Sequence, residues 1–258
     1  MDENIVPGAI FQFDPIQSES SGDYSLEYSG ISEGVNGVDQ ENNLIKFSGE
    51  SCAILKSNGR NLNPFTLNLN NGATLELLYN TKCIGNLNAP VMSTFQNAND
   101  NSLGIEVTYK QISVGLGGAS RYTVDVSENT WIHATVVFST IGFSDSAEET
   151  IRGGYMYIYI NGCMVLVQPL QSLPSANRNA FLSLNVDNAL LNYGESDVRV
   201  LRFYNSPLSP AQVVQNYINS ISDVDEKEAA RGRNQLDLPV VTFTEKLGTE
   251  YHFTDLLA

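Results

Sequence analysis

The chain has 258 residues, of which 42% are hydrophobic and only 17% are charged. This is enough apolar material for one large domain, and it argues against long disordered stretches. The 29 acidic and 14 basic side chains give a net charge of −15, which excludes nucleic acid as a partner and disfavours anionic membranes.

The three cysteines form no CxxC pair, which favours buried thiols in a reducing compartment over a disulfide framework. Residues 1–13 have no basic region and no long apolar run, so they do not resemble a signal peptide. No stretch reaches the roughly 18 apolar residues of a membrane-spanning helix. We therefore expect synthesis in a cytoplasm, without membrane insertion.

Short apolar stretches separated by Gly, Asn and Pro predict β-strands through most of the chain. Within one of them, residues 73–81, alternation places Leu75, Leu77 and Tyr79 on one face and Glu76 with Leu78 on the other. The region 17–43 reads as a loop with room for one edge strand. The predicted strands are 8–14, 43–49, 52–57, 73–81, 91–96, 103–116 (as a hairpin or one long strand), 121–126, 131–138, 155–167, 181–186 and 198–204.

Two local signals stand out in the last third of the chain. Asn161-Gly162 divides residues 155–167 and predicts a tight hairpin turn. Ser209 is a good helix N-cap, Pro210 suits the first helical position, and Gln212 can close a capping box. Leu208 before the cap can pack onto Val213. We expect one short helix from Ser209, with an apolar side against the sheets.

The composition changes after residue 222. Residues 223–235 form a charged segment with helical propensity, and residues 238–245 read as a new strand. We therefore predict a domain over residues 1–222, followed by a linker and strand over 223–258. That strand is expected to pair with another subunit or module, in keeping with a homo-oligomer.

Four motifs follow one another in the C-terminal half of the chain: Trp131-Ile132-His133, Tyr159-Ile160-Asn161-Gly162, Arg202-Phe203-Tyr204-Asn205 and Leu208-Ser209. Their order resembles that of LamG-like, concanavalin A-like jelly-roll domains, as found in phage tail and bacterial surface proteins. The resemblance covers roughly residues 8–222. It implies an all-β fold in which two antiparallel sheets form a jelly-roll sandwich, with one short C-terminal helix and an extended tail.

Tyr155, Tyr157 and Tyr159 lie on one face of a predicted strand. They could form an aromatic platform that stacks on sugar rings. The alternative is cross-strand packing, which aromatic side chains also favour, with the aliphatic core on the opposite face.

No cofactor is required by the sequence, but a Ca²⁺ site is one hypothesis. Asp145, Glu148, Glu149 and Asp187 lie in acidic loops, and some relatives of the resembled family bind calcium there. Against this, Ca²⁺ needs six to eight converging oxygens, and no D-x-D-x-D-G loop brings them together. Solvated loop charge is the simpler interpretation.

Catalysis is not expected. A glycosidase of this fold needs two facing carboxylates, and the nearest pattern, Glu195-Ser196-Asp197, lacks the later glutamate. His133 is expected to be a structural, hydrogen-bonded side chain, because a zinc site or a triad would need further partners.

The function that these features favour is a non-catalytic module of a virion, in a phage tail fibre or appendage, that binds a host glycan or mediates assembly. A bacterial cell surface is the alternative location. Its expected partners are a glycan or other virion proteins. A purely structural connector or decoration protein, and a glycoside hydrolase, are the alternative functions.

Overall fold

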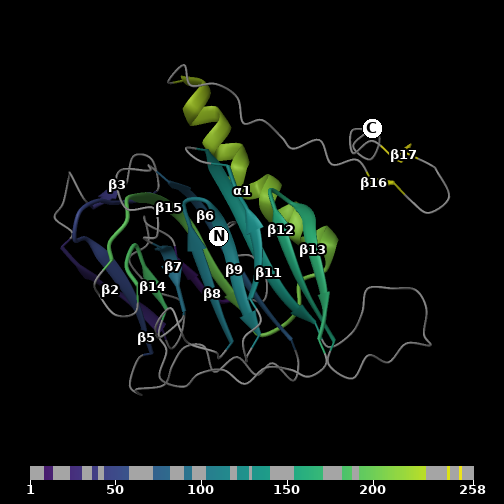
Figure 1. The fold of residues 1–258 in the computed structure, drawn as a ribbon. Coiled ribbons are helices and arrows are strands. Elements are labelled where there is room, and N and C mark those ends of the chain that lie inside the picture. Colours follow the sequence, from purple (N-terminus) through teal and green to yellow (C-terminus); the bar gives the residue numbers. More distant parts are fainter. Residues whose placement is uncertain are drawn as a thin grey trace.

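A computed structural model of the chain forms two antiparallel β-sheets packed face to face, with one helix on the outside (Figure 1). The all-β sandwich expected from the sequence is confirmed. The residues described are 9–13, 24–30, 37–39, 44–57, 72–81, 90–94, 103–116, 121–127, 130–139, 154–170, 182–187, 192–230, 243–244 and 250–251. In this part of the chain, no helix is long and apolar enough to cross a membrane.

The first sheet has eight strands in the order β13-β12-β11-β6-β15-β4-β3, and β1 pairs with β15 beside β4. Long central strands that are buried along nearly their whole length form its middle. The strands are β1 (Ala9–Phe13), β3 (Val38–Asp39), β4 (Leu44–Phe47), β6 (Ala73–Thr81), β11 (Trp131–Ser139), β12 (Tyr155–Ile160), β13 (Cys163–Pro169) and β15 (Ser196–Tyr204).

The second sheet has seven strands in the order β10-β9-β8-β7-β14-β5-β2. The predicted 103–116 segment is a hairpin, and the predicted loop around 17–43 contains β2 and β3. The strands are β2 (Tyr24–Ser29), β5 (Cys52–Ser57), β7 (Pro90–Ser93), β8 (Leu103–Thr108), β9 (Gln111–Leu116), β10 (Arg121–Asp125) and β14 (Ser183–Leu184).

The main hydrophobic core lies between the sheets and follows the alternation of the strands. On β6, Leu75, Leu77 and Tyr79 belong to this core, whereas Leu78 joins a separate cluster on the outer face with Tyr217 of the helix. The predicted division of this strand into two faces is confirmed. Both faces of the eight-stranded sheet are therefore covered, one by the second sheet and one by the helix.

The Asn161-Gly162 turn forms as predicted and also serves the neighbouring strand. Both residues have positive φ, 51° and 77°, as a two-residue hairpin turn requires. The backbone N–H of His133 donates to Asn161 Oδ1 at 2.9 Å, and the N–H of Asn161 donates to the His133 carbonyl at 2.8 Å. A Cβ at Gly162 would lie 3.1 Å from the ring of Tyr217, so the helix also needs a glycine here.

Helix α1 (Pro210–Ala230) begins where the sequence predicts. The Gln212 N–H donates to Ser209 Oγ at 3.3 Å, and the Ser209 N–H donates to Gln212 Oε1 at 2.8 Å, which completes the capping box. Leu208 and Val213 belong to one buried cluster, as the predicted staple requires.

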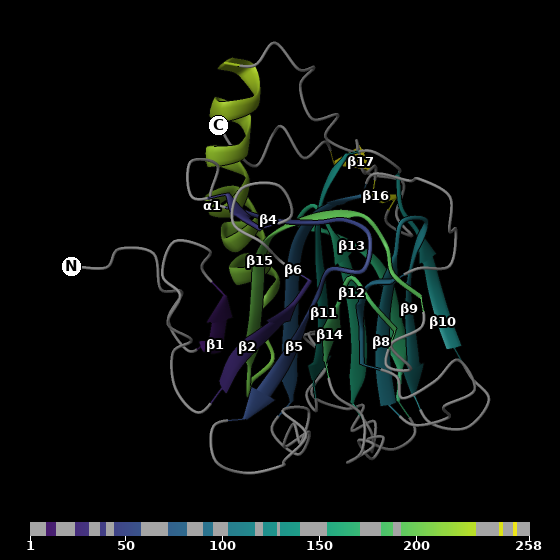
Figure 2. The ribbon, with the colours of Figure 1, turned by 90° about the vertical axis from the view of Figure 1, so that its left-hand side faces the viewer.

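The helix is longer than expected and continues through residue 222 to Ala230. Residues 223–230 contain good helix formers and no Gly or Pro, so nothing in them stops the helix. Its last turns extend beyond the ends of the strands (Figures 1 and 2). Of the predicted strand 238–245, Phe243–Thr244 (β16) pairs with Glu250–Tyr251 (β17) of the same chain, and residues 238–242 and 245 lie outside the described residues.

Candidate functional site

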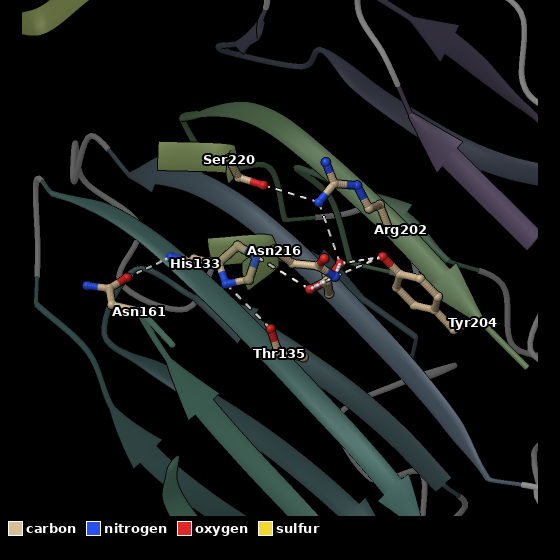
Figure 3. A network of polar contacts seen from close by, with 8 residues as sticks. His133, Thr135, Asn161, Arg202, Tyr204, Asn216 and Ser220 are labelled. Atoms are coloured by element: carbon tan, nitrogen blue, oxygen red, sulfur yellow. Dashed lines mark hydrogen bonds and ion pairs between the residues drawn. The ribbon is translucent and has the colours of Figure 1, made fainter. Parts of the chain in front are cut away.

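A cluster of titratable side chains lies between the outer face of the eight-stranded sheet and helix α1 (Figure 3). Its centre is the carboxylate of Glu76, which is 0% exposed. The Tyr204 hydroxyl donates to Glu76 Oε2 at 2.7 Å, and Asn216 Nδ2 donates to Oε1 and Oε2 at 2.9 and 3.0 Å. The helix therefore supplies part of the shell of a carboxylate on the sheet.

Arg202 balances the charge of Glu76. Its Nη1 atom lies 3.6 Å from Glu76 Oε2 and donates to Ser220 Oγ at 3.1 Å. β15 thus contributes both the cation and the phenol of the cluster, and α1 contributes an amide and a hydroxyl. A buried ion pair with this many hydrogen bonds fixes where the helix lies, because a shifted helix would leave charge unpaired.

His133 completes the cluster from β11. Its Nε2 lies 3.6 Å from Glu76 Oε1, and its Nδ1 lies 3.5 Å from Thr135 Oγ1. Complete burial is the main reason that the pKa of His133 falls to about 4; Glu76 opposes the shift and Arg202 adds to it. The ring is neutral at pH 7 and closed to solvent, so the structural role expected for His133 agrees with its surroundings. The cluster is buried and joins the sheet to the helix.

The three tyrosines of β12 lie on the same outer face, as the alternation predicted. Tyr157 and Tyr159, however, are only 4% and 1% exposed, within a cluster that includes Val213 of the helix. The predicted sugar platform therefore needs correction for these two rings, because α1 covers them. Tyr155 is half-buried at the edge of that cluster, and its glycan contact stays a prediction.

The calcium hypothesis divides between described and undescribed residues. Asp145, Glu148 and Glu149 lie outside the described residues. Asp187 is described, and its Oδ2 accepts from Asn192 Nδ2 at 2.6 Å. Within the described part, no group of three or more His, Cys, Asp or Glu side chains could hold a metal ion. A Ca²⁺ site thus stays a prediction.

The outer face of the seven-stranded sheet has a different character. One row of directly opposite residues crosses the whole sheet, and nearly all of its members are polar. We call it the polar row. Its central serines, at 0–4% exposure, form a floor of small side chains. In register, from β10 to β2, the row is Thr123, Ser113, Glu106, Ser93, Ser183, Ile54 and Glu27.

Charged side chains stand next to this floor. Arg121 lies opposite Gly115, and Gly115 lies opposite Gly104. The long side chain of Arg121 therefore has no bulky side chain directly across from it on β9 or β8. Its Nη1 reaches within 3.8 Å of Glu106 Oε2, and the two side chains remain 33% and 22% exposed. Partial burial raises the pKa of Glu106, Arg121 opposes this, and Asp187 adds to it. Arg121 and Glu106 therefore form an ion pair beside a floor of small side chains, and Asp187 adds negative potential there.

A strained residue fixes the loop that carries Asp187. Asn185 has φ 62° and is 0% exposed. Its Nδ2 donates to the carbonyls of Ser51 and Gly194 at 2.9 and 2.8 Å, and its Oδ1 accepts from Ser196 Oγ at 3.1 Å. The left-handed conformation ends β14 after two residues, which is why the predicted strand 181–186 is shorter. Buried strain of this kind occurs where a structure must place a loop accurately.

Sequence reasoning missed this polar face. The signal was present as single polar residues between apolar ones, such as Glu106 between Ile105 and Val107, but the same pattern occurs on any exposed sheet face. Only the pairing of strands distant in sequence shows that the serines are contiguous.

The glycosidase candidate Glu195-Ser196-Asp197 lies away from this face. Its Asp197 is buried in β15 of the eight-stranded sheet and lies opposite Asn80 and Lys46.

No known family model matches the chain, and no curated protein matches it. Among solved structures, the botulinum neurotoxin serotype D binding domain matches with a TM-score of 0.57 and 13% identity. The binding domain of botulinum neurotoxin DC matches with a TM-score of 0.56 and 13% identity, both in complex with SialylT and in complex with rat synaptotagmin II.

These likenesses cover 82–83% of this chain and 51–52% of those chains, so this chain spans about half the length of its structural neighbours. At this identity they show a common β-sandwich fold. The sugar and receptor contacts named for those domains are not assigned to residues of this chain. The LamG-like family remains a resemblance in the order of motifs.

Replacing Glu76→Gln should lower the free energy of unfolding by about 3 kcal/mol, because it leaves Arg202 buried without its counter-ion. Urea denaturation monitored by circular dichroism measures this change. Glu50→Gln, at an exposed carboxylate, is the control and should change stability by no more than about 0.5 kcal/mol. Equal effects of the two substitutions would contradict the role given to Glu76.

The neutral state of His133 predicts a pH dependence of stability. Its pKa is about 4 in the folded chain and 6.5 in the unfolded chain, so the unfolded chain binds the proton first. Stability should therefore fall as pH decreases from 6.5 towards 4, by up to about 3 kcal/mol. Above pH 6.5 both states hold a neutral His133, so this residue should cause no pH dependence there. His133→Gln should flatten the wild-type curve between these pH values, measured as unfolding free energy; an unchanged slope would contradict the assignment.

Asn185→Ala should destabilise the chain by about 2–4 kcal/mol, for two reasons. It removes the three buried hydrogen bonds of the side chain, and it leaves alanine in a left-handed conformation that no side-chain hydrogen bond stabilises. Asn185→Gly retains the conformation and should lose less. Thermal unfolding compares the two. If glycine is as harmful as alanine, the backbone conformation at this position is not a source of strain.

Proposed function

We propose that this chain is a non-catalytic carbohydrate-binding module that contacts its ligand with the outer face of the seven-stranded sheet. The observation that carries the proposal is the partly exposed Glu106–Arg121 pair, which stands beside the buried serines of the polar row. Carboxylate and guanidinium groups are suitable partners for sugar hydroxyls, because a carboxylate accepts hydrogen bonds and a guanidinium donates them.

The two sheets differ in a way that supports this choice. The outer face of the eight-stranded sheet is occupied by α1, which packs on its tyrosines and on Glu76. The outer face of the seven-stranded sheet has accessible charged side chains at Glu106, Arg121 and Asp125. A ligand on the first face would have to displace the helix, whereas the second face needs no such change.

Several structural neighbours are binding domains, and one of them is described in complex with SialylT. This supports carbohydrate recognition as a use to which such a fold can be put, although one fold hosts many functions. The charge of this chain favours a neutral sugar over an acidic one. Glu106 and Asp187 would repel a sialic acid carboxylate, and a single nearby Arg121 is already engaged with Glu106.

We further propose that the module belongs to a larger surface particle, a phage tail fibre or a related virion appendage, with the bacterial cell surface as the alternative. The acidic, Asn- and Ser-rich composition supports this setting. Weak single-site sugar affinity would suit it, because many copies on one particle raise the overall affinity.

The proposal is tested by binding of the full chain to a broad glycan array, with and without a chelator. We expect binding to a neutral glycan, and independence from the chelator would argue against Ca²⁺ in recognition. Glu106→Gln should weaken the affinity for the identified glycan at least about tenfold, measured by calorimetry, because hydrogen bonds to a charged group are the stronger ones.

Glu27→Gln is the matched control, since Glu27 is exposed and lies at the far end of the polar row. It should leave the affinity nearly unchanged. Failure to bind any glycan would remove the carbohydrate function and leave the connector role. Turnover of an oligosaccharide, lost in Glu106→Gln, would instead establish the glycosidase alternative.

A further inference from the structure

We propose that the chain forms a two-fold symmetric dimer in which β10 pairs antiparallel with β10 of a second copy. β10 is the edge of the seven-stranded sheet, and among the described strands its only neighbour is β9. Its five residues alternate between exposed and half-buried side chains along their whole length. The inference does not depend on the carbohydrate function.

The sequence of β10 is self-complementary in charge. If the two-fold axis passes through Thr123, Arg121 of each copy lies directly opposite Asp125 of the second copy. The dimer then contains two pairs of opposite charge at symmetric positions. Opposite charges at directly opposed positions stabilise an antiparallel pair, and like charges there destabilise it. A register shifted by two residues would place Arg121 against Thr123, so the charges favour the centred one.

The two central pairs fit the same register. Tyr122 lies opposite Val124 of the second copy, which gives an aromatic against a β-branched side chain. Both are partly buried against the core of their own sandwich. Pairing would cover the remaining exposed part of each, and it would join the apolar layers of the two copies.

The backbone of β10 is oriented for this contact. The N–H of Val126 donates to the carbonyl of Lys110 on the β9 side at 2.7 Å. Backbone groups alternate in direction along an antiparallel strand, so Val124 and Tyr122 also face β9, and Thr123 faces away from it. Thr123 would therefore exchange two hydrogen bonds with its counterpart at the two-fold axis.

The opposite sheet has an edge that lacks these features. β13 exposes Met164, Val165 and Val167 but carries no charge to select a register. Its pairing with β12 is also interrupted by a bulge between Ile158 and Tyr159, and bulged edges resist regular strand addition. Association through β13 is the competing outcome that the experiment must separate.

Dimerisation through β10 would join the two seven-stranded sheets into one continuous sheet. The outer faces of the two copies would then lie side by side on the same surface. Each polar row ends at Thr123, so the two rows would meet at the two-fold axis. If the carbohydrate function holds, the dimer presents two sites on one surface, and binding to a dense glycan layer gains from both.

Sedimentation velocity of the full chain tests the proposal. A five-residue strand gives a small interface, so measurements should run from about 1 to about 300 µM. We expect a monomer–dimer equilibrium in the wild type. Asp125→Arg places like charges opposite each other and should weaken dimerisation at least about tenfold. Adding Arg121→Asp to that variant reverses both charges and should restore most of the dimer.

A cysteine at the two-fold axis gives a second readout. Thr123→Cys should form a disulfide-linked dimer under mild oxidation, since opposed residues in a strand pair lie within disulfide range. Thr130→Cys is the matched control, because Thr130 is exposed but lies outside β10, and it should remain monomeric on a denaturing gel.

A monomeric wild type over this concentration range would overturn the proposal. So would a dimer that Asp125→Arg leaves intact, since the interface would then lie elsewhere, β13 included. The carbohydrate function is judged separately, by the glycan array and by the calorimetry of Glu106→Gln, neither of which requires the dimer. Loss of the dimer in Asp125→Arg and its recovery on adding Arg121→Asp confirm the interface.

Discussion

The burial of one carboxylate organises the outer half of this protein. Glu76 lies on the central strand β6, on the face turned away from the sandwich core, where its charge must be paired. Arg202 and Tyr204 meet it from β15, and Asn216 meets it from the helix. Three elements far apart in sequence therefore meet at one group, and their relative positions depend on one another.

This constraint assigns different tasks to the two sheets. Because α1 must cover Glu76, it also covers Tyr157 and Tyr159, and the outer face of the eight-stranded sheet becomes a second interior. The outer face of the seven-stranded sheet keeps the charged side chains Glu106 and Arg121 partly exposed. The proposed recognition and dimer contact thus use the sheet that the helix does not cover.

The likeness to botulinum neurotoxin binding domains fits this division without deciding it. A fold shared at 13% identity retains the arrangement of the sheets, whereas specificity depends on a few side chains on one face. In this chain the proposed contacts are made by Glu106 and Arg121, beside the serines of the polar row. These side chains are brought together by the pairing of strands, some of which are distant in sequence.

The sequence by itself determined the elements that depend on local chemistry. Alternation identified the core face of β6, Asn161-Gly162 specified a turn with positive φ, and Ser209 with Gln212 specified the start of the helix. Only the tertiary structure decided what covers the β12 tyrosines and which polar residues form the row around Glu106. The physical reason is that exposure and contiguity depend on strand order and helix docking, which join residues more than a hundred positions apart, such as Glu76 and Asn216.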